Sequence, residues 1–278
     1  MRLLFLTFVT MIAFAANSVL NRAALETGGI DALSFAVLRV FAGVVVLMVL
    51  VALRRETGLI KGAFDPFAAV GLLAYMLGFS FAYNSLDTGL GALILFGGVQ
   101  ITMFLGAVLA GRKPMALQWI GAAVAFSGLV VLLFPSGAAP NVLGLGCMIV
   151  AAIGWGIYSL QGAKARYPLV ATCANFSAAL PVVLLVWVFV GTSGVELRGV
   201  ILALMSGGIA SALGYALWYA VLPQLQTATA AVAQLTVPLI AAVGGFVVLS
   251  EPVTVIFAVS SALVLGGIGI SVWAANRG

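Results

Sequence analysis

The feature that most constrains this chain is the length of its apolar segments. Apolar runs follow one another along nearly the whole sequence, separated by short breaks such as ETGGID, GRKP and SEP. A helix needs roughly 20 apolar residues to cross the ~30 Å hydrocarbon layer of a bilayer, and these runs have that length. The breaks carry charge, Gly or Pro, as turns require. The sequence therefore predicts an integral membrane protein.

About ten helices of this kind fit into the chain, and the short joins leave no room for a soluble domain. The composition agrees, because 64% of the residues are hydrophobic and only 7% are charged. The mean hydropathy of +1.27 lies far outside the range of soluble domains. The expected fold is all-α, with ten transmembrane helices at 3–21, 32–53, 66–86, 90–110, 115–134, 141–161, 169–190, 198–220, 224–249 and 253–274.

The basic residues indicate how the chain is oriented. The 12 Lys and Arg residues are scattered in ones and twos between apolar runs, so a pI near 9.6 does not indicate binding to nucleic acid. With a cytoplasmic N-terminus, the inner loops and ends hold Arg2, Arg54, Arg55, Lys61, Arg112, Lys113, Lys164, Arg166 and Arg277. Only Arg22 and Arg198 then fall outside, as the positive-inside bias favours. We expect both termini in the cytoplasm and a location in a bacterial inner membrane.

The two halves of the chain resemble each other. GFSFAYNSLDTGLGALILFGGVQITMFLGAVLAGRKP aligns with GYALWYAVLPQLQTATAAVAQLTVPLIAAVGGFVVLSEP, which places Gly78 on Gly214. Because each repeat has an odd number of helices, the second repeat must enter the bilayer upside down. We therefore expect two inverted five-helix repeats, residues 1–134 and 141–278. Secondary transporters have this architecture, with the substrate near the midplane between the repeats.

The first residues can also be interpreted as a cleaved signal peptide. Arg2 precedes an apolar run, and an Ala-x-Ala triplet ends at Ala15. However, AFAANSVL aligns with GWGIYSL of the second half, which places Phe14 on Trp155. Cleavage would leave one repeat a helix short. We therefore interpret this run as the first helix of the folded protein.

Three short motifs resemble a known family. AFAANSVLNRA in the first span, SEPVT after the ninth and LGGIGI in the tenth are similar to the drug/metabolite transporter superfamily, specifically its EamA-type ten-helix exporters. The resemblance covers essentially the whole chain and is nearest to YddG-type exporters of aromatic amino acids. It implies export of small metabolites. In the first half GRKP stands where such proteins often have a Gly-Glu pair, so any role of that acid would rest on Glu251.

Other classes of protein fit less well. The chain has no His, and its seven acids lie at or near span ends, so neither a hydrolase centre nor a metal cluster is expected. We expect no cofactor. A channel stays open as an alternative, although the sequence has no filter motif. A broad metabolite or drug exporter is the second alternative. The partners expected are a small-molecule substrate and the lipid bilayer, and a monomer would suffice.

Paired helix interruptions give one indication of a substrate site. Gly97 and Gly98 interrupt the fourth apolar run, and Pro238 interrupts the ninth, shortly after Gln234. Interruptions in symmetry-related spans free backbone groups, which must then face a cavity. The alternative is that these small residues only permit close helix packing.

Aromatic residues give a second indication. Tyr75 and Phe79 share one face of the third span, because they are four residues apart. With residues of other spans they predict a wall that is apolar but carries hydrogen-bonding groups, formed by Phe14, Asn17, Tyr75, Phe79, Trp155, Tyr158, Tyr215 and Gln234. Such a wall suits amphipathic solutes, whose rings could stack on Trp155 or Tyr75.

Arg39 is the only charged residue well inside a span. It could face the cavity and attract a substrate carboxylate, or it could have a structural role, in which it snorkels outward or binds helix-end carbonyls. The sequence favours the structural role. A guanidinium cannot release its proton at physiological pH, and the carboxylates lie near the interfaces. We therefore expect transport that follows the substrate gradient without proton coupling.

Overall fold

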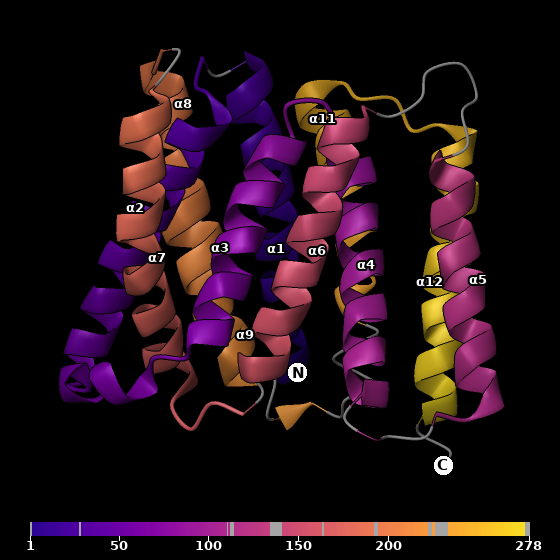
Figure 1. Ribbon diagram of the computed structural model, residues 1–278. Coiled ribbons are helices and arrows are strands. Elements are labelled where there is room, and N and C mark those ends of the chain that lie inside the picture. Colours follow the sequence, from indigo (N-terminus) through magenta and orange to yellow (C-terminus); the bar gives the residue numbers. More distant parts are fainter. Residues whose placement is uncertain are drawn as a thin grey trace.

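The computed structural model describes residues 2–27, 29–109, 111, 114–133, 141–162, 164–191, 194–221, 224–225 and 233–275. Within these ranges the chain is helical, and its only strand-like pairing is an isolated bridge between Ile30 and Val195. Figure 1 shows the helices standing side by side in one bundle. The all-α prediction is confirmed for this part of the chain.

The helices occur where the apolar runs predict them. In chain order they are α1 Arg2–Thr27, α2 Ala32–Leu53, the short η1 Thr57–Leu59 and η2 Lys61–Ala63, α3 Pro66–Ala82, α4 Thr88–Leu109, α5 Ala116–Leu133, α6 Val142–Gly162, α7 Pro168–Val190, α8 Leu197–Met205, the π-helical η3 Ser206–Leu213, α9 Gly214–Val221, α11 Val237–Leu249 and α12 Val255–Ala275. Because α8, η3 and α9 follow one another without a break, the described ranges contain ten spans.

Seven of these spans are long and apolar enough to cross a membrane, and α3, α5 and α11 have shorter apolar stretches. The first span is longer than expected, since α1 continues past residue 21 to Thr27. In the ninth, the described helix α11 runs from Val237 to Leu249. The first part of the predicted ninth span, residues 226–232, lies outside the described residues.

Several helices begin at residues that the sequence placed at span ends. The Asp31 carboxylate accepts the backbone N–H groups of Leu33 and Ser34 at the start of α2. The Asp65 carboxylate accepts the N–H of Ala68 at the start of α3, whose first residue is a proline. Such caps satisfy backbone donors that a helix leaves unpaired at its N-terminus. The polar residues between the spans therefore fix where the helices start.

The spans pack in a regular pattern. α3 lies along α6, and α1 lies along the continuous span formed by α8, η3 and α9. α4 contacts α6, and α11 contacts α1. The remaining close pairs are α2 with α7, α4 with α11, and α5 with α12. Figure 1 shows α5 and α12 as a pair at one edge of the bundle, beside α4.

The basic loops gather at one end of the bundle. In Figure 1, α1 begins and α12 ends at the lower side, where the α2–α3 and α6–α7 connections also lie. These connections carry Arg54, Arg55, Lys61, Lys164 and Arg166. The opposite end holds the α1–α2 and α11–α12 connections.

Candidate functional site

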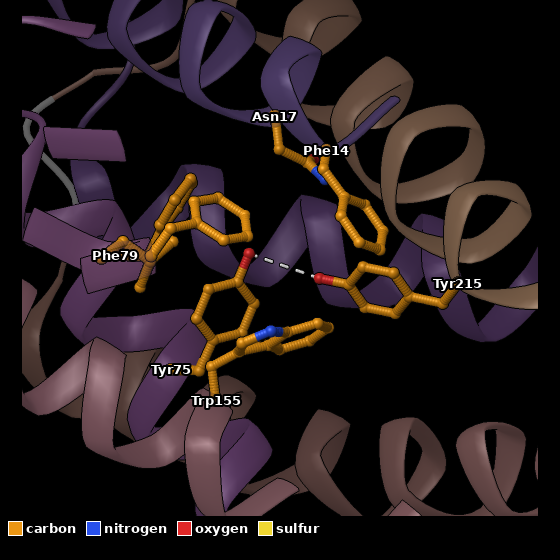
Figure 2. A pocket seen from close by; sticks show the side chains of 8 residues that line it. Phe14, Asn17, Tyr75, Phe79, Trp155 and Tyr215 are labelled. Carbon is orange, nitrogen blue, oxygen red and sulfur yellow. Dashed lines mark hydrogen bonds between the residues drawn. The ribbon is translucent and has the colours of Figure 1, made fainter. Parts of the chain in front are cut away.

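A small cavity is lined by side chains of five helices, α1, α3, α4, α6 and α9 (Figure 2). Its wall consists of Phe14, Asn17, Tyr75, Phe79, Leu95, Phe96, Trp155 and Tyr215. The cavity holds about 10 Å³, which is room for roughly one water molecule. The structure is therefore closed around this site, and a larger solute can enter only when the wall moves.

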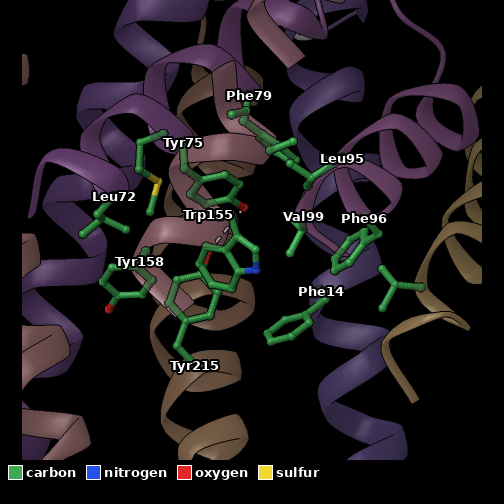
Figure 3. Close-up of a cluster of buried hydrophobic side chains, with 14 of the residues drawn as sticks. Phe14, Leu72, Tyr75, Phe79, Leu95, Phe96, Val99, Trp155, Tyr158 and Tyr215 are labelled. Atoms are coloured by element: carbon green, nitrogen blue, oxygen red, sulfur yellow. Dashed lines mark hydrogen bonds between the residues drawn. The ribbon is translucent and has the colours of Figure 1, made fainter. Parts of the chain in front are cut away.

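Six of the eight wall residues are aromatic, and four of their rings pack closely together (Figure 3). The ring centroid of Trp155 lies 4.8 Å from that of Tyr75 and 4.9 Å from that of Tyr215. Phe14 meets Trp155 edge-on at 6.2 Å and Tyr215 at 5.8 Å. Aromatic pairs favour these tilted and edge-on arrangements. A planar apolar group inserted among these rings would find the same kind of contact.

Arg39 lies behind this aromatic wall and has no exposed surface. Its Nε donates to Ser211 Oγ at 3.1 Å, and its Nη2 donates to the Tyr75 hydroxyl at 2.9 Å. The guanidinium carbon lies 4.8 Å from the ring centroid of Phe79 and 5.2 Å from that of Tyr75. The expectation that Arg39 snorkels outward is therefore wrong. Polar partners on η3 and α3 hold the side chain inside the bundle instead.

The amide of Asn17 connects α1 to the π-helical segment η3. Its Oδ1 accepts hydrogen bonds from Ser206 Oγ at 2.8 Å and from Ser211 Oγ at 3.1 Å. Since Ser211 also accepts from Arg39, a continuous set of hydrogen bonds runs from α1 through η3 to α2. π-Helical turns of this kind are often found at functional sites.

The structure brings together most of the aromatic residues that the sequence selected. Phe14, Asn17, Tyr75, Phe79, Trp155 and Tyr215 all contribute to the cavity wall. Leu95 and Phe96 were not predicted, because they lie in a uniformly apolar run. The available signal was their position directly before the Gly97–Gly98 pair.

Two candidates lie outside the wall. Tyr158 packs behind Trp155, with ring centroids 5.5 Å apart, and its hydroxyl donates to Thr172 Oγ1 at 3.2 Å. Gln234 is half-buried, and its Oε1 has no hydrogen-bond partner among the described residues. Neither side chain contributes to the closed cavity.

The expected helix interruption in the fourth span is absent. α4 continues through Gly97 and Gly98 as regular helix. A Cβ at Gly98 would lie 2.8 Å from the Cβ of Ala152, so this glycine permits α4 to approach α6. Pro238 differs, because it lies in the first turn of α11, where proline is favoured. Here the helix does begin at the predicted interruption.

A second polar cluster, formed around Arg22, lies at the opposite end from the basic loops. Arg22 Nε lies 3.3 Å from Glu251 Oε1, and its Nη1 donates to the carbonyl of Tyr83 at 3.1 Å. Glu251 Oε2 accepts the N–H of Thr88 at 2.8 Å and so caps α4. Burial raises the pKa of Glu251 above its ordinary value, against the lowering effects of Thr88 and Arg22. The cluster also contains Glu26 and Asp87, at 3.3 and 3.9 Å from Arg22.

A bundle of ten helical spans, with an aromatic cavity built from both halves of the chain, defines the class of multi-pass membrane transporters. Residues 142–273 match the sequence profile of the EamA-like transporter family. An uncharacterized protein of Pseudomonas aeruginosa is 41% identical over 271 residues, which are 97% of this chain and 94% of that protein. The family match points to a membrane transporter rather than to an enzyme.

More distant relatives include two proteins described as probable amino-acid metabolite efflux pumps. The one from Salmonella typhimurium is 25% identical over 68% of each chain. The one from Escherichia coli is 24% identical over 73% of this chain and 76% of that protein. A crystal structure with 18% identity superimposes with a TM-score of 0.71, covering 98% of this chain and 97% of the other. That likeness shows a common fold.

Proposed function

We propose that this protein is a secondary transporter that exports small amphipathic metabolites, with amino acids, including aromatic ones, as the leading substrates. The observation that carries this proposal is the cavity wall, which combines aromatic faces with the polar groups of Asn17, Tyr75 and Tyr215. Its residues come from both halves of the chain. The efflux pumps among the relatives support amino-acid metabolites as the substrate class.

The proposed mechanism is alternating access between two inverted repeats, residues 1–134 and 141–278. The packing pattern supports it. We match each span of the first half with the span five places later, so that α1 corresponds to α6 and α3 to the α8–η3–α9 span. The α3–α6 contact then corresponds to the contact between the α8–η3–α9 span and α1, and both contacts are present. The α4–α6 contact likewise exchanges with α11–α1, while α2–α7, α4–α11 and α5–α12 map onto themselves. A two-fold axis in the membrane plane would produce this pattern.

The same register relates residues of the cavity. Phe14 is matched with Trp155, and Phe79 with Tyr215, and all four line the wall. The proposed axis would therefore pass close to the cavity. An exchange of conformation between the repeats would then expose the cavity to one side or the other, which is what a carrier requires.

We further propose that flux follows the substrate gradient without proton coupling. None of the seven acids contributes to the cavity wall, and the guanidinium of Arg39 stays protonated. The basic loops at one end of the bundle support a cytoplasmic location for both termini in a bacterial inner membrane. Both proposed repeats belong to one chain, so a monomer is sufficient.

Transport by purified protein in proteoliposomes tests this proposal. With labelled phenylalanine we expect saturable counterflow, competition by other aromatic amino acids, and no need for an imposed ion gradient. Phe126→Ala on α5 is the matched control, since α5 contributes no residue to the cavity wall and this side chain is 59% exposed.

Three results would contradict parts of the proposal. Competition by unrelated dyes but not by amino acids would favour a broad drug exporter. Non-saturating conductance would indicate a channel. Concentrative uptake that requires a proton gradient and collapses with an ionophore would direct attention to Glu251, the most buried carboxylate of the Arg22 cluster.

A further inference from the structure

Every acid of this chain lies in a described segment, and each is placed away from the cavity wall. Asp31 and Asp65 cap α2 and α3. Glu26, Asp87 and Glu251 lie around Arg22. Glu56 and Glu196 precede η1 and α8. An ammonium group of a substrate would therefore find no carboxylate at this site.

The charge next to the cavity is instead positive and has no counter-ion. The hydrogen-bond partners of Arg39 are the neutral hydroxyls of Ser211 and Tyr75. Its Nη1 is buried and has no hydrogen-bond partner among the described residues. A buried charge is costly unless it is paired, and charges inside the membrane usually have partners. Arg39 therefore retains donor capacity for an anion.

The donors of Arg39 are connected to the cavity through Tyr75. This hydroxyl accepts from Arg39 on one side and lies 3.3 Å from the Tyr215 hydroxyl on the other (Figure 2). Both rings line the cavity, and the guanidinium stacks against Tyr75 and Phe79. Hydroxyl protons can rotate toward a new acceptor. When the wall opens, a carboxylate can reach the guanidinium and the tyrosine hydroxyls together.

We infer that the site recognises its substrate by a carboxylate, held by Arg39 and Tyr75, and by an aromatic ring, held by Trp155 and Phe14, and that it does not recognise the amino group. This inference rests on the proposed function and narrows its substrate class. Aromatic monocarboxylates that lack an amino group, such as 3-phenylpropionate and phenylpyruvate, are then substrates alongside phenylalanine. Aromatic amines are not.

A ligand series tests this inference in wild-type protein. Phenylalanine, 3-phenylpropionate and phenethylamine each compete against labelled phenylalanine in counterflow, and their binding is measured in parallel by thermal stabilisation in detergent. We expect phenylpropionate to compete within about tenfold of phenylalanine, because only the amino group is lost. Phenethylamine should be at least roughly tenfold weaker than phenylpropionate, because a hydrogen bond to a charged group is lost.

Variants of Arg39 separate recognition from a structural role. Arg39→Lys keeps the charge but loses the planar fork, and we expect weaker binding of both carboxylates with phenethylamine unchanged. Arg39→Gln removes the charge, and it should abolish the preference for carboxylates over phenethylamine. If Arg39 had a purely structural role, both substitutions would weaken the binding of all three ligands alike. Phe126→Ala is again the matched control.

The outcomes distinguish this inference from the proposed function. If phenylalanine and phenethylamine compete while phenylpropionate does not, the inference is wrong and the transporter proposal stands. If Arg39→Gln retains the preference for carboxylates, the inference is also overturned. If neither phenylalanine nor phenylpropionate binds or is transported, both the inference and the leading substrate class are wrong.

Discussion

The Nη2 atom of Arg39 donates a 2.9 Å hydrogen bond to the hydroxyl of Tyr75, and neither side chain is exposed to more than 4%. This contact joins the only charge inside the second span to the aromatic wall contributed by α3. It explains how a long apolar helix can carry an arginine, because the bundle supplies a polar partner where lipid cannot. It also makes the position of the charge sensitive to a single hydroxyl group.

Tyr75→Phe should therefore weaken both the fold and binding. The substitution keeps the ring but leaves another donor of Arg39 unpaired, and we expect a loss of about 1–3 kcal/mol in the free energy of unfolding. Thermal unfolding in detergent and the half-saturation concentration for phenylalanine measure the two effects. Tyr167→Phe is the control, because this tyrosine is 39% exposed and should tolerate the change. Equal stability of the two variants would contradict the assigned role of the hydroxyl.

Trp155→Phe should reduce the affinity for aromatic substrates. The indole contacts Phe14, Tyr75 and Tyr215, and a smaller ring reduces the stacking surface. Aromatic contacts contribute about 0.5–1.5 kcal/mol beyond burial, so the affinity should fall roughly 2- to 10-fold. Trp119→Phe on the exposed side of α5 serves as the control in the same counterflow assay. A similar loss in both variants would place the substrate elsewhere.

Gly207→Ala should destabilise the contact between η3 and α2. A Cβ at Gly207 would collide with the backbone carbonyl of Arg39, which cannot move aside as a flexible side chain can. We expect a loss of about 1–3 kcal/mol in thermal unfolding measurements, typical of overpacked sites. Gly146→Ala is the matched control, since a Cβ there meets nothing within 4 Å. Its replacement should be neutral or stabilising by up to about 1 kcal/mol, because alanine is the better helix former. Equal thermal stability of the two variants would contradict the close packing of η3 against α2.

Glu251 should make stability depend on pH in an unusual direction. Because burial raises the pKa of Glu251 in the folded protein, the folded state binds this proton more tightly than the unfolded state does. The stability gained from this tighter proton binding is fully present below the ordinary glutamate pKa of about 4.3. It is lost as the pH rises through the raised pKa of the folded protein. Relative to Glu251→Gln, wild-type stability should therefore fall as the pH rises through this window.

Thermal unfolding of both proteins across this pH range measures the difference. Arg22, Glu26 and Asp87 are common to both proteins, so the comparison reports the effect of removing the Glu251 carboxylate. A difference that grows in favour of wild type with rising pH would mean that the pairing with Arg22 outweighs burial, and it would contradict the stated direction of the shift.

The spans were predictable because the bilayer sets the length of an apolar helix, and that length is visible in the sequence. Residues such as Tyr75 and Phe79 were predictable as a pair because helical periodicity fixes their common face. That Trp155 and Tyr215 of other spans line the same cavity was predicted from their residue types alone. The sequence therefore indicated most of the aromatic wall.

The polar contacts were not predictable in the same way. Arg39 and Ser211 are 172 residues apart, and Arg22 and Glu251 are 229 apart, so only the folded bundle brings them together. The burial of Arg39 depends on those partners, which explains why its apolar neighbours alone suggested snorkelling. Gly98 shows a different limit, because glycine that breaks a helix and glycine that permits close packing look alike in a sequence.

The central claim is that the aromatic cavity is the substrate site of a carrier. Concentration-dependent counterflow of phenylalanine by wild-type protein and by Trp155→Phe, without any imposed ion gradient, tests it most directly. We predict saturable exchange in both proteins, with a half-saturation concentration roughly 2- to 10-fold higher in the variant. Flux that rises linearly with concentration, or identical saturation curves for the two proteins, would contradict the account.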